Sequence, residues 1–269
     1  MKKKIIGLLA LSFLFSLTET QSQTTRVLKK TIELQMPGEE GSNGASVAWH
    51  PIQKKYYASF AGNAIYPLAL FDVTGKKLSS DDLESQIDVR GLWYNPNTNL
   101  ICGNGYKENG WFSYILDKNG IPEDFSILHN GQYQPSQQSV GSYNTKKDLL
   151  YFLNGIEIVV YNKYGEQLTD STIRLSLNID NEFLDEDEAY LEANFNTTTV
   201  VFTGILKSEF GLLNYTKPQI ELYNMKSGAH TQILKLPDGA PAFNWFNFSF
   251  ANGTYWLFDK DNRKWIGYK

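Results

Sequence analysis

The side chains that most often carry out chemistry in proteins are sparse in this sequence. Its 269 residues include one cysteine, Cys102, and three histidines that lie far apart in the chain, His50, His129 and His230. A single cysteine excludes an internal disulfide and a zinc site made of several cysteines. The Gly-x-Ser-x-Gly motif of serine hydrolases and the glycine-rich phosphate-binding loops do not occur in the sequence. The sequence therefore offers no catalytic motif and predicts no catalytic residue, metal site or cofactor.

One acidic segment, residues 178–188, has enough carboxylates to suggest calcium binding. Calcium loops need acidic residues at alternating positions and a glycine that allows a sharp turn. The Asp-x-Asp-x-Asp-Gly spacing of calcium loops is absent and the segment contains no glycine, which favours a solvated acidic loop.

Composition and charge place the chain among exported globular proteins. Residues 1–23 contain three lysines, an apolar run from Ile5 to Leu17 and a polar stretch, the pattern of a secretory signal peptide. Without this segment 22 basic and 28 acidic residues remain, a net charge of −6. Nucleic-acid binding requires clustered Lys and Arg, so we expect a secreted or periplasmic protein without a nucleic-acid partner. No membrane span is expected after the signal is removed.

A short pattern recurs four times: an apolar strand, then Asp or Asn, two or three further residues and a glycine. The copies are Leu70–Gly75, Ile115–Gly120, Val160–Gly165 and Leu222–Gly228. Asp and Asn side chains bond to nearby backbone groups and glycine adopts positive φ. Each copy is therefore expected to be a strand that ends in a tight turn.

A second pattern precedes each copy, a short strand that ends in an aromatic residue usually followed by Asn or His. Its aromatic residues are Trp49, Tyr94, Tyr143, Phe195 and, in a degenerate copy, Phe250. A further apolar strand follows each of these positions, at 56–60, 100–103, 149–153, 200–203 and 255–258. A fourth strand fits at 125–128, 173–177 and 232–236, and weakly at 83–87 in the first unit. Helical periodicity is scarce, and 184–191 is the best candidate for a short helix.

Four-stranded units that repeat every 40–50 residues are typical of a β-propeller. Residues 24–269 resemble the loosely conserved blades of secreted bacterial propellers. This resemblance implies a single all-β domain of five four-stranded antiparallel blades. The last unit ends after three strands, so Arg26–Met36 is expected to pair with 265–268 and close the ring. An open β-sandwich and a six-bladed ring with an extra hairpin at 205–218 remain as alternatives.

The resemblance also implies where a ligand would bind, because propellers often use the loops that precede the innermost strands. Amides, charged groups and aromatic rings in these positions suit a glycan or a peptide. Arg90 and Glu192 fall within expected innermost strands, where an unpaired charge is costly, so each should line the channel or find a partner. A one-residue shift in register would reverse the faces. The candidate ligand-binding residues are Asn43, Asp88, Arg90, Gln138, Glu192, Asn244, Trp245 and Asn247.

The function that we expect is a binding scaffold for a glycan, a peptide or an envelope protein. The alternative is an enzyme at the same face, because some propellers are glycoside hydrolases or metal-dependent lactonases. A glycoside hydrolase needs two carboxyl groups at a defined separation, and only Asp88 and Glu192 are candidates. The sequence does not match the carboxylate pattern of such enzymes, which favours the binding scaffold.

Overall fold

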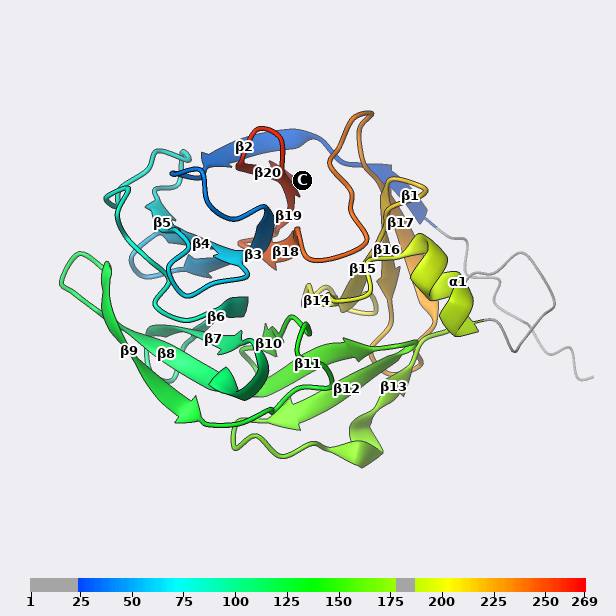
Figure 1. Cartoon of the computed structure of the whole chain (residues 1–269). Helices are drawn as coiled ribbons and strands as arrows, with labels where there is room; N and C mark the ends of the chain where they lie inside the picture. Colours follow the sequence, from blue (N-terminus) through cyan, green and yellow to red (C-terminus); the bar gives the residue numbers. More distant parts are fainter. Residues whose placement is uncertain (1–23, 178–186) are drawn as a thin grey trace, which may run out of the picture.

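The computed structural model describes residues 24–177 and 187–269. The expected signal peptide and most of the acidic segment 178–188 lie outside the described residues. The described chain forms five sheets, in which consecutive strands pair antiparallel, arranged as blades around a central axis (Figure 1). This confirms the all-β, five-bladed propeller, and the alternatives of a sandwich and a six-bladed ring are wrong.

Each blade begins with a strand beside the central axis and continues outward. The first blade contains β3 (Asn43–His50), β4 (Lys55–Ala61) and β5 (Leu68–Phe71). The second contains β6 (Val89–Asn95), β7 (Leu100–Gly105), β8 (Trp111–Leu116) and β9 (Pro122–His129). The third contains β10 (Ser142–Asn144), β11 (Leu149–Asn154), β12 (Glu157–Asn162) and β13 (Ile173–Arg174). The fourth contains β14 (Val201–Phe202), β15 (Phe210–Asn214), β16 (Gln219–Tyr223) and β17 (His230–Lys235).

The fifth blade joins the two ends of the chain. It contains β18 (Phe248–Ala251), β19 (Thr254–Asp259) and β20 (Lys264–Tyr268), with β2 (Lys30–Gln35) at its outer edge. Strand β2 pairs antiparallel with β20, which sets the buried Leu34 opposite Trp265. The predicted closure by an N-terminal strand is therefore confirmed.

The expected N-terminal strand is divided between two blades. Its first residues belong to β1 (Thr24–Val27), which pairs in parallel with β17 at the outer edge of the fourth blade. The buried Leu28 then leads the chain to the fifth blade. The N-terminal segment thus joins two neighbouring blades, and the parallel pairing had no signal in the sequence.

The repeated turn forms as predicted in all four copies. In the first copy, Asp72 Oδ1 accepts hydrogen bonds from the backbone N–H groups of Thr74 and Lys76, and Gly75 has a φ of 86°. Asp117, Asn162 and Asn224 make equivalent side-chain to backbone bonds. These turns connect the third and fourth strands of each blade. In the first blade only two isolated bridges, Pro67–Glu84 and Phe71–Lys77, represent the fourth strand, in keeping with its weak sequence pattern.

The fourth blade corrects one part of the sequence interpretation. The expected innermost strand at 192–195 lies instead at the end of helix α1 (Asp187–Asn194), and the innermost strand is β14. The segment 200–203, expected as the second strand, contains β14, and the second strand is β15. The additional residues of this unit thus form a helix and a connection rather than a sixth blade.

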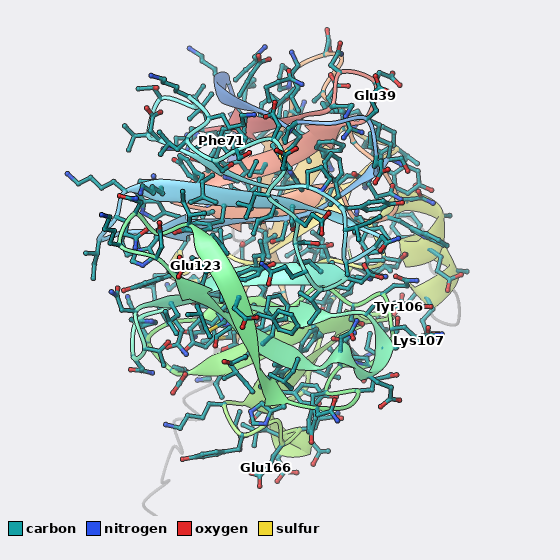
Figure 2. The ribbon with its side chains drawn as sticks, turned by 60° about the vertical axis from the view of Figure 1, so that its left-hand side comes forward. Glu39, Phe71, Tyr106, Lys107, Glu123 and Glu166 are labelled. Carbon is teal, nitrogen blue, oxygen red and sulfur yellow. The ribbon has the colours of Figure 1, made fainter. Side chains whose placement is uncertain are left out.

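Aromatic side chains pack between neighbouring blades. Trp256, Trp265 and Phe258 of the fifth blade form one buried cluster with Phe60 and Phe71 of the first. The rings of Phe60 and Phe258 meet edge to face with centroids 5.3 Å apart. The order of the strands also gives the ring two faces, which we call the strand-start face and the strand-end face, after the ends of the innermost strands. In Figure 2, Glu39, Tyr106 and Lys107 lie toward the strand-start face, on the right, whereas Phe71 and Glu123 lie on the left.

Candidate functional site

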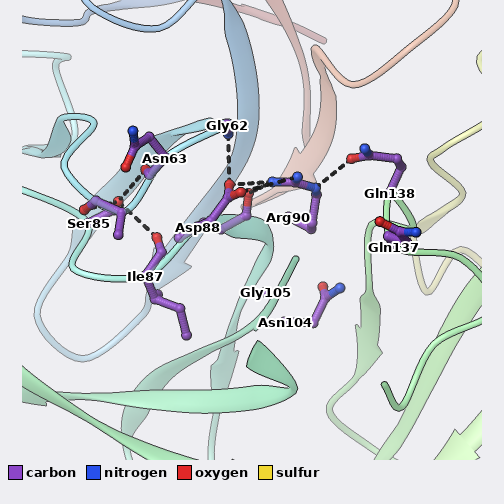
Figure 3. Close-up of polar contacts among 12 residues, drawn as sticks. Gly62, Asn63, Ser85, Ile87, Asp88, Arg90, Asn104, Gly105, Gln137 and Gln138 are labelled. Carbon is purple, nitrogen blue, oxygen red and sulfur yellow. Dashed lines mark hydrogen bonds and ion pairs between the residues drawn. The ribbon is translucent and has the colours of Figure 1, made fainter. Parts of the chain in front are cut away.

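Three of the predicted site residues meet at the strand-start end of the channel (Figure 3). Arg90 lies in β6 and is 3% exposed. Its Nη1 and Nη2 donate hydrogen bonds to the carboxylate of Asp88, and its Nε donates to Gln138 Oε1 at 2.8 Å. The expectation that a charge at Arg90 requires a partner is confirmed.

The surroundings of Arg90 join four blades at one point. Its guanidinium carbon lies 4.6 Å from the ring centroid of Tyr106 in its own blade and 5.4 Å from that of Phe246, which precedes the fifth. Asp88 Oδ1 also accepts a hydrogen bond from the backbone N–H of Gly62 in the first blade. Gln138 precedes the third blade. A guanidinium paired in this way orients the blades, because charge-assisted bonds fix both distance and direction.

The predicted residues of the fifth blade lie at the same end of the channel. Asn247 is fully buried, and its Oδ1 accepts a hydrogen bond from the backbone N–H of Gly44 in the first blade. Its Nδ2 donates to the backbone oxygen of Trp245 and lies 3.5 Å from Asn43 Oδ1. Asn244 and Trp245 are exposed, with Trp245 at 55%. Asn43 and Asn247 therefore lie together, and Trp245 projects beside them into solvent.

Glu192 does not join this group. It is exposed on α1, at the outer rim of the ring beside the fourth blade (Figure 1). The aromatic residue of the repeated pattern does occupy a position in the sheet. Phe195 is buried and forms an isolated β-bridge with Asn214, the last residue of β15. The preceding residues nevertheless form a helix, which turns Glu192 away from the channel. The two carboxylates considered for hydrolysis, Asp88 and Glu192, are thus on different parts of the molecule.

Two further buried asparagines, which were not among the predicted site residues, also link neighbouring blades through hydrogen bonds to the backbone, as Asn247 does. Asn104, at the end of β7, accepts a hydrogen bond from the backbone N–H of Gly141 and donates to the backbone oxygen of Ser139, which links the second and third blades. Asn196 donates to the backbone oxygens of Phe243 and Phe246, which links the fourth and fifth blades. Buried backbone groups need such partners. The Asn that follows an aromatic residue in the repeated pattern was the only available signal, and it applied to Asn196 alone.

A cavity of about 480 Å³ occupies the channel between its middle and the strand-end face. It is lined by residues of all five innermost strands and of the segments that precede or follow them. Its lining begins near Ser46, Gly141 and Thr199 and reaches Pro51, Pro96 and Asn252, where the first hairpin turns begin. The cavity thus opens at the face opposite to the predicted ligand-binding loops.

Aromatic rings and small hydroxyl groups dominate this cavity. The aromatic residues of its lining are Trp49, Trp93, Tyr94, Tyr143, Phe202, Phe248 and Phe250, of which Phe248 is fully buried in the core. Ser46 and Ser249 bond to one another through their hydroxyl groups at 3.2 Å, and Ser142 Oγ accepts a bond from the backbone N–H of Phe202. Among the described residues that line the cavity there is no Asp, Glu, His, Lys, Arg or Cys.

The described residues show no constellation for metal or acid–base chemistry in the channel. Within residues 24–177 and 187–269, no group of three or more His, Cys, Asp or Glu is placed to hold a metal ion. Asp88, at the strand-start end of the channel, is already engaged by Arg90 and Gly62. In the same part of the chain, no helix is long and apolar enough to cross a membrane.

Comparisons with known proteins support the fold. No protein-family model matches the sequence, and no curated protein matches it. The structure is similar to that of a glutaminyl cyclase from Myxococcus xanthus, with a TM-score of 0.52 and 9% sequence identity over 92% of this chain and 98% of that one. Nidogen from a nidogen–laminin complex aligns with a TM-score of 0.41 and 8% identity over 70% of this chain and 62% of that one. At this identity the first likeness shows a common fold only.

Proposed function

We propose that the protein is an exported binding propeller whose ligand occupies the cavity at the strand-end face. The observation that carries this proposal is the cavity itself, whose described lining is rich in aromatic residues and contains no acidic or basic residue. Concave, largely apolar sites with a few polar groups are typical of ligand binding. A neutral ligand with an apolar face, either a glycan or an apolar peptide segment, fits this lining best.

The polar residues at the strand-start end have a different role in this proposal. Their side chains already make internal hydrogen bonds, either to one another or to neighbouring blades. These residues are Asp88, Arg90, Gln138 and Asn247. A ligand that used them would have to replace these internal bonds. We therefore move the proposed ligand site to the opposite end of the channel from the one expected from the sequence.

Two tryptophans distinguish the two ends experimentally. Trp49 lines the cavity, whereas Trp245 is 55% exposed at the strand-start end. We propose to screen neutral oligosaccharides and apolar peptides against the purified protein by tryptophan fluorescence, and then to compare Trp49→Ala with Trp245→Ala. Loss of an aromatic contact together with its buried area should weaken binding by about tenfold or more in Trp49→Ala. Equal affinity in Trp49→Ala and a loss in Trp245→Ala would contradict the proposal.

A cyclase activity is the second candidate, because the similar Myxococcus xanthus structure is named a glutaminyl cyclase. General acid–base catalysis requires a titratable group near the reacting atoms. The cavity lining offers only the hydroxyls of Tyr94 and Tyr143, and the pKa of Tyr143 is raised by burial and by its bond to Asp148. Incubation with peptides that begin with glutamine, followed by mass spectrometry, tests this candidate. Release of ammonia at a rate that depends on the cavity residues would favour the enzyme.

A further inference from the structure

Charge is distributed unequally between the two faces of the ring. The turns between the first and second strands and between the third and fourth strands lie at the strand-end face, and they carry eight exposed lysines. These are Lys54, Lys76, Lys118, Lys146, Lys147, Lys163, Lys207 and Lys226. The described turns at the strand-start face carry mostly acidic residues, including Glu39, Glu40, Asp81, Asp82, Glu84, Glu108 and Asp238. An acidic protein thus has one basic face.

Five carboxylates lie in the same turns and offset part of this charge, so that the eight exposed lysines leave an excess of three positive charges; they are Asp72, Asp117, Asp148, Glu166 and Glu209. Asp72 and Asp117 accept bonds from the backbone of their own turns. Glu209 accepts bonds from the backbone N–H groups of Lys207 and Met225. Glu166 accepts a hydrogen bond from the side chain of Asn162, and Asp148 forms an ion pair with Lys163, with its carboxylate 3.5 Å from Nζ. Most of the lysine ammonium groups therefore point to solvent without an ion-pair partner among the described contacts.

Large apolar side chains project from the same turns. Leu206 is 83% exposed, Ile52 69%, Tyr164 65% and Val73 53%. They belong to three different blades, and each lies within three residues of a lysine. All these turns emerge at the strand-end face, those between the first and second strands beside the channel and those between the third and fourth strands toward the outer edge.

The combination of exposed lysines and isolated apolar side chains distinguishes a membrane from a protein as the partner of this face. Lysine is depleted in the centres of protein interfaces, where apolar residues form one contiguous patch. Separate apolar tips flanked by lysines instead match a bilayer interface, where the tips enter the acyl boundary and the ammonium groups reach anionic headgroups. We infer that the strand-end face docks on a membrane that contains anionic lipids. This inference goes beyond the proposed ligand and does not depend on it.

The test is sedimentation of the purified protein with vesicles of phosphatidylcholine, with and without phosphatidylglycerol, at low and high salt. The N-terminus of each preparation is determined by mass spectrometry. Only preparations with the same N-terminus are compared, so that residues of the expected signal peptide cannot cause a difference between variants. We expect binding to the anionic vesicles that weakens as salt is added. In the double variant Lys146→Glu/Lys147→Glu, the affinity for anionic vesicles should fall roughly fivefold or more for each lysine. In Leu206→Ser, the same affinity should fall several-fold.

The controls are exposed residues of the opposite face, so that none of the variants disturbs the core. Lys107→Glu/Lys217→Glu matches the lysine pair, and Trp245→Ser matches Leu206→Ser. Binding retained by the controls and lost by the strand-end variants supports the inference. Absence of binding to anionic vesicles at low salt, or equal losses in both sets, would overturn it. Binding to polyglutamate but not to vesicles would also overturn it and would indicate an acidic protein partner instead.

Discussion

Loss of Asp88 should destabilise the ring strongly, and loss of its partner Arg90 as well should restore part of the stability. The side chain of Arg90 is 4% exposed and that of Asp88 15%. In Asp88→Ala the guanidinium would remain buried without its carboxylate, and removal of one partner of such a pair costs about 3–5 kcal/mol. In the double variant Asp88→Ala/Arg90→Met, an apolar side chain would occupy the space between Tyr106 and Phe246, and no charge would be left unpaired.

Urea unfolding followed by tryptophan fluorescence measures both effects. With a denaturant slope of about 1–3 kcal/mol per molar, Asp88→Ala should lower the urea midpoint by roughly 1–5 M. The double variant should be more stable than Asp88→Ala alone by at least about 1 kcal/mol, because replacing a whole buried pair with apolar groups is often close to neutral. Additive losses, or an Asp88→Ala midpoint within experimental error of the wild type, would refute the reasoning.

Three further results are expected. Asn247→Ala should reduce the free energy of unfolding by about 1–3 kcal/mol, measured by the same unfolding assay, because it removes the acceptor of a buried backbone N–H. Gly75→Ala should lower the melting temperature more than Gly253→Ala, although both glycines have positive φ. A Cβ atom added at Gly75 would overlap a backbone carbonyl oxygen of β2, whereas a Cβ atom added at Gly253 would have none of the surrounding atoms within 4 Å. Burial raises the pKa of Cys102 to about 12, so the native thiol should resist a thiol reagent at pH 9 that labels the unfolded chain at once. Because the pKa in the folded state is the higher one, the stability contributed by this thiol is complete at neutral pH and is lost as the pH rises from about 9 toward about 12.

The repeated turns explain why the architecture was predictable from the sequence. An Asp or Asn followed by glycine is a local signal, because the side chain bonds within its own turn, as Asp72 does. The period of these signals then gave the number of blades. The open edge left by a three-stranded last unit predicted the pairing of β2 with β20.

The features that were missed depend on contacts between distant segments. The segment at Glu192 carries the residue types of an inner strand, but the longer fourth unit places α1 there and uses β14 beside the axis. Likewise, the pairing of β1 with β17 and the bonds of Asn104 join parts of the chain that share no local pattern. The location of the cavity depends on which end of the channel is filled by Arg90 and its neighbours, and residue types alone do not determine this.

Closure of the ring by β2 is the claim on which the cavity depends, because residues of all five innermost strands line it. The most direct test compares the unfolding of a chain that begins at Leu28, which lacks only β1, with one that begins at Pro37, which also lacks β2. We expect the first to unfold cooperatively with a modest loss of stability. The second should expose the buried Trp265 to solvent and lose its cooperative transition. A chain that begins at Pro37 and unfolds like the intact protein would contradict the closed ring.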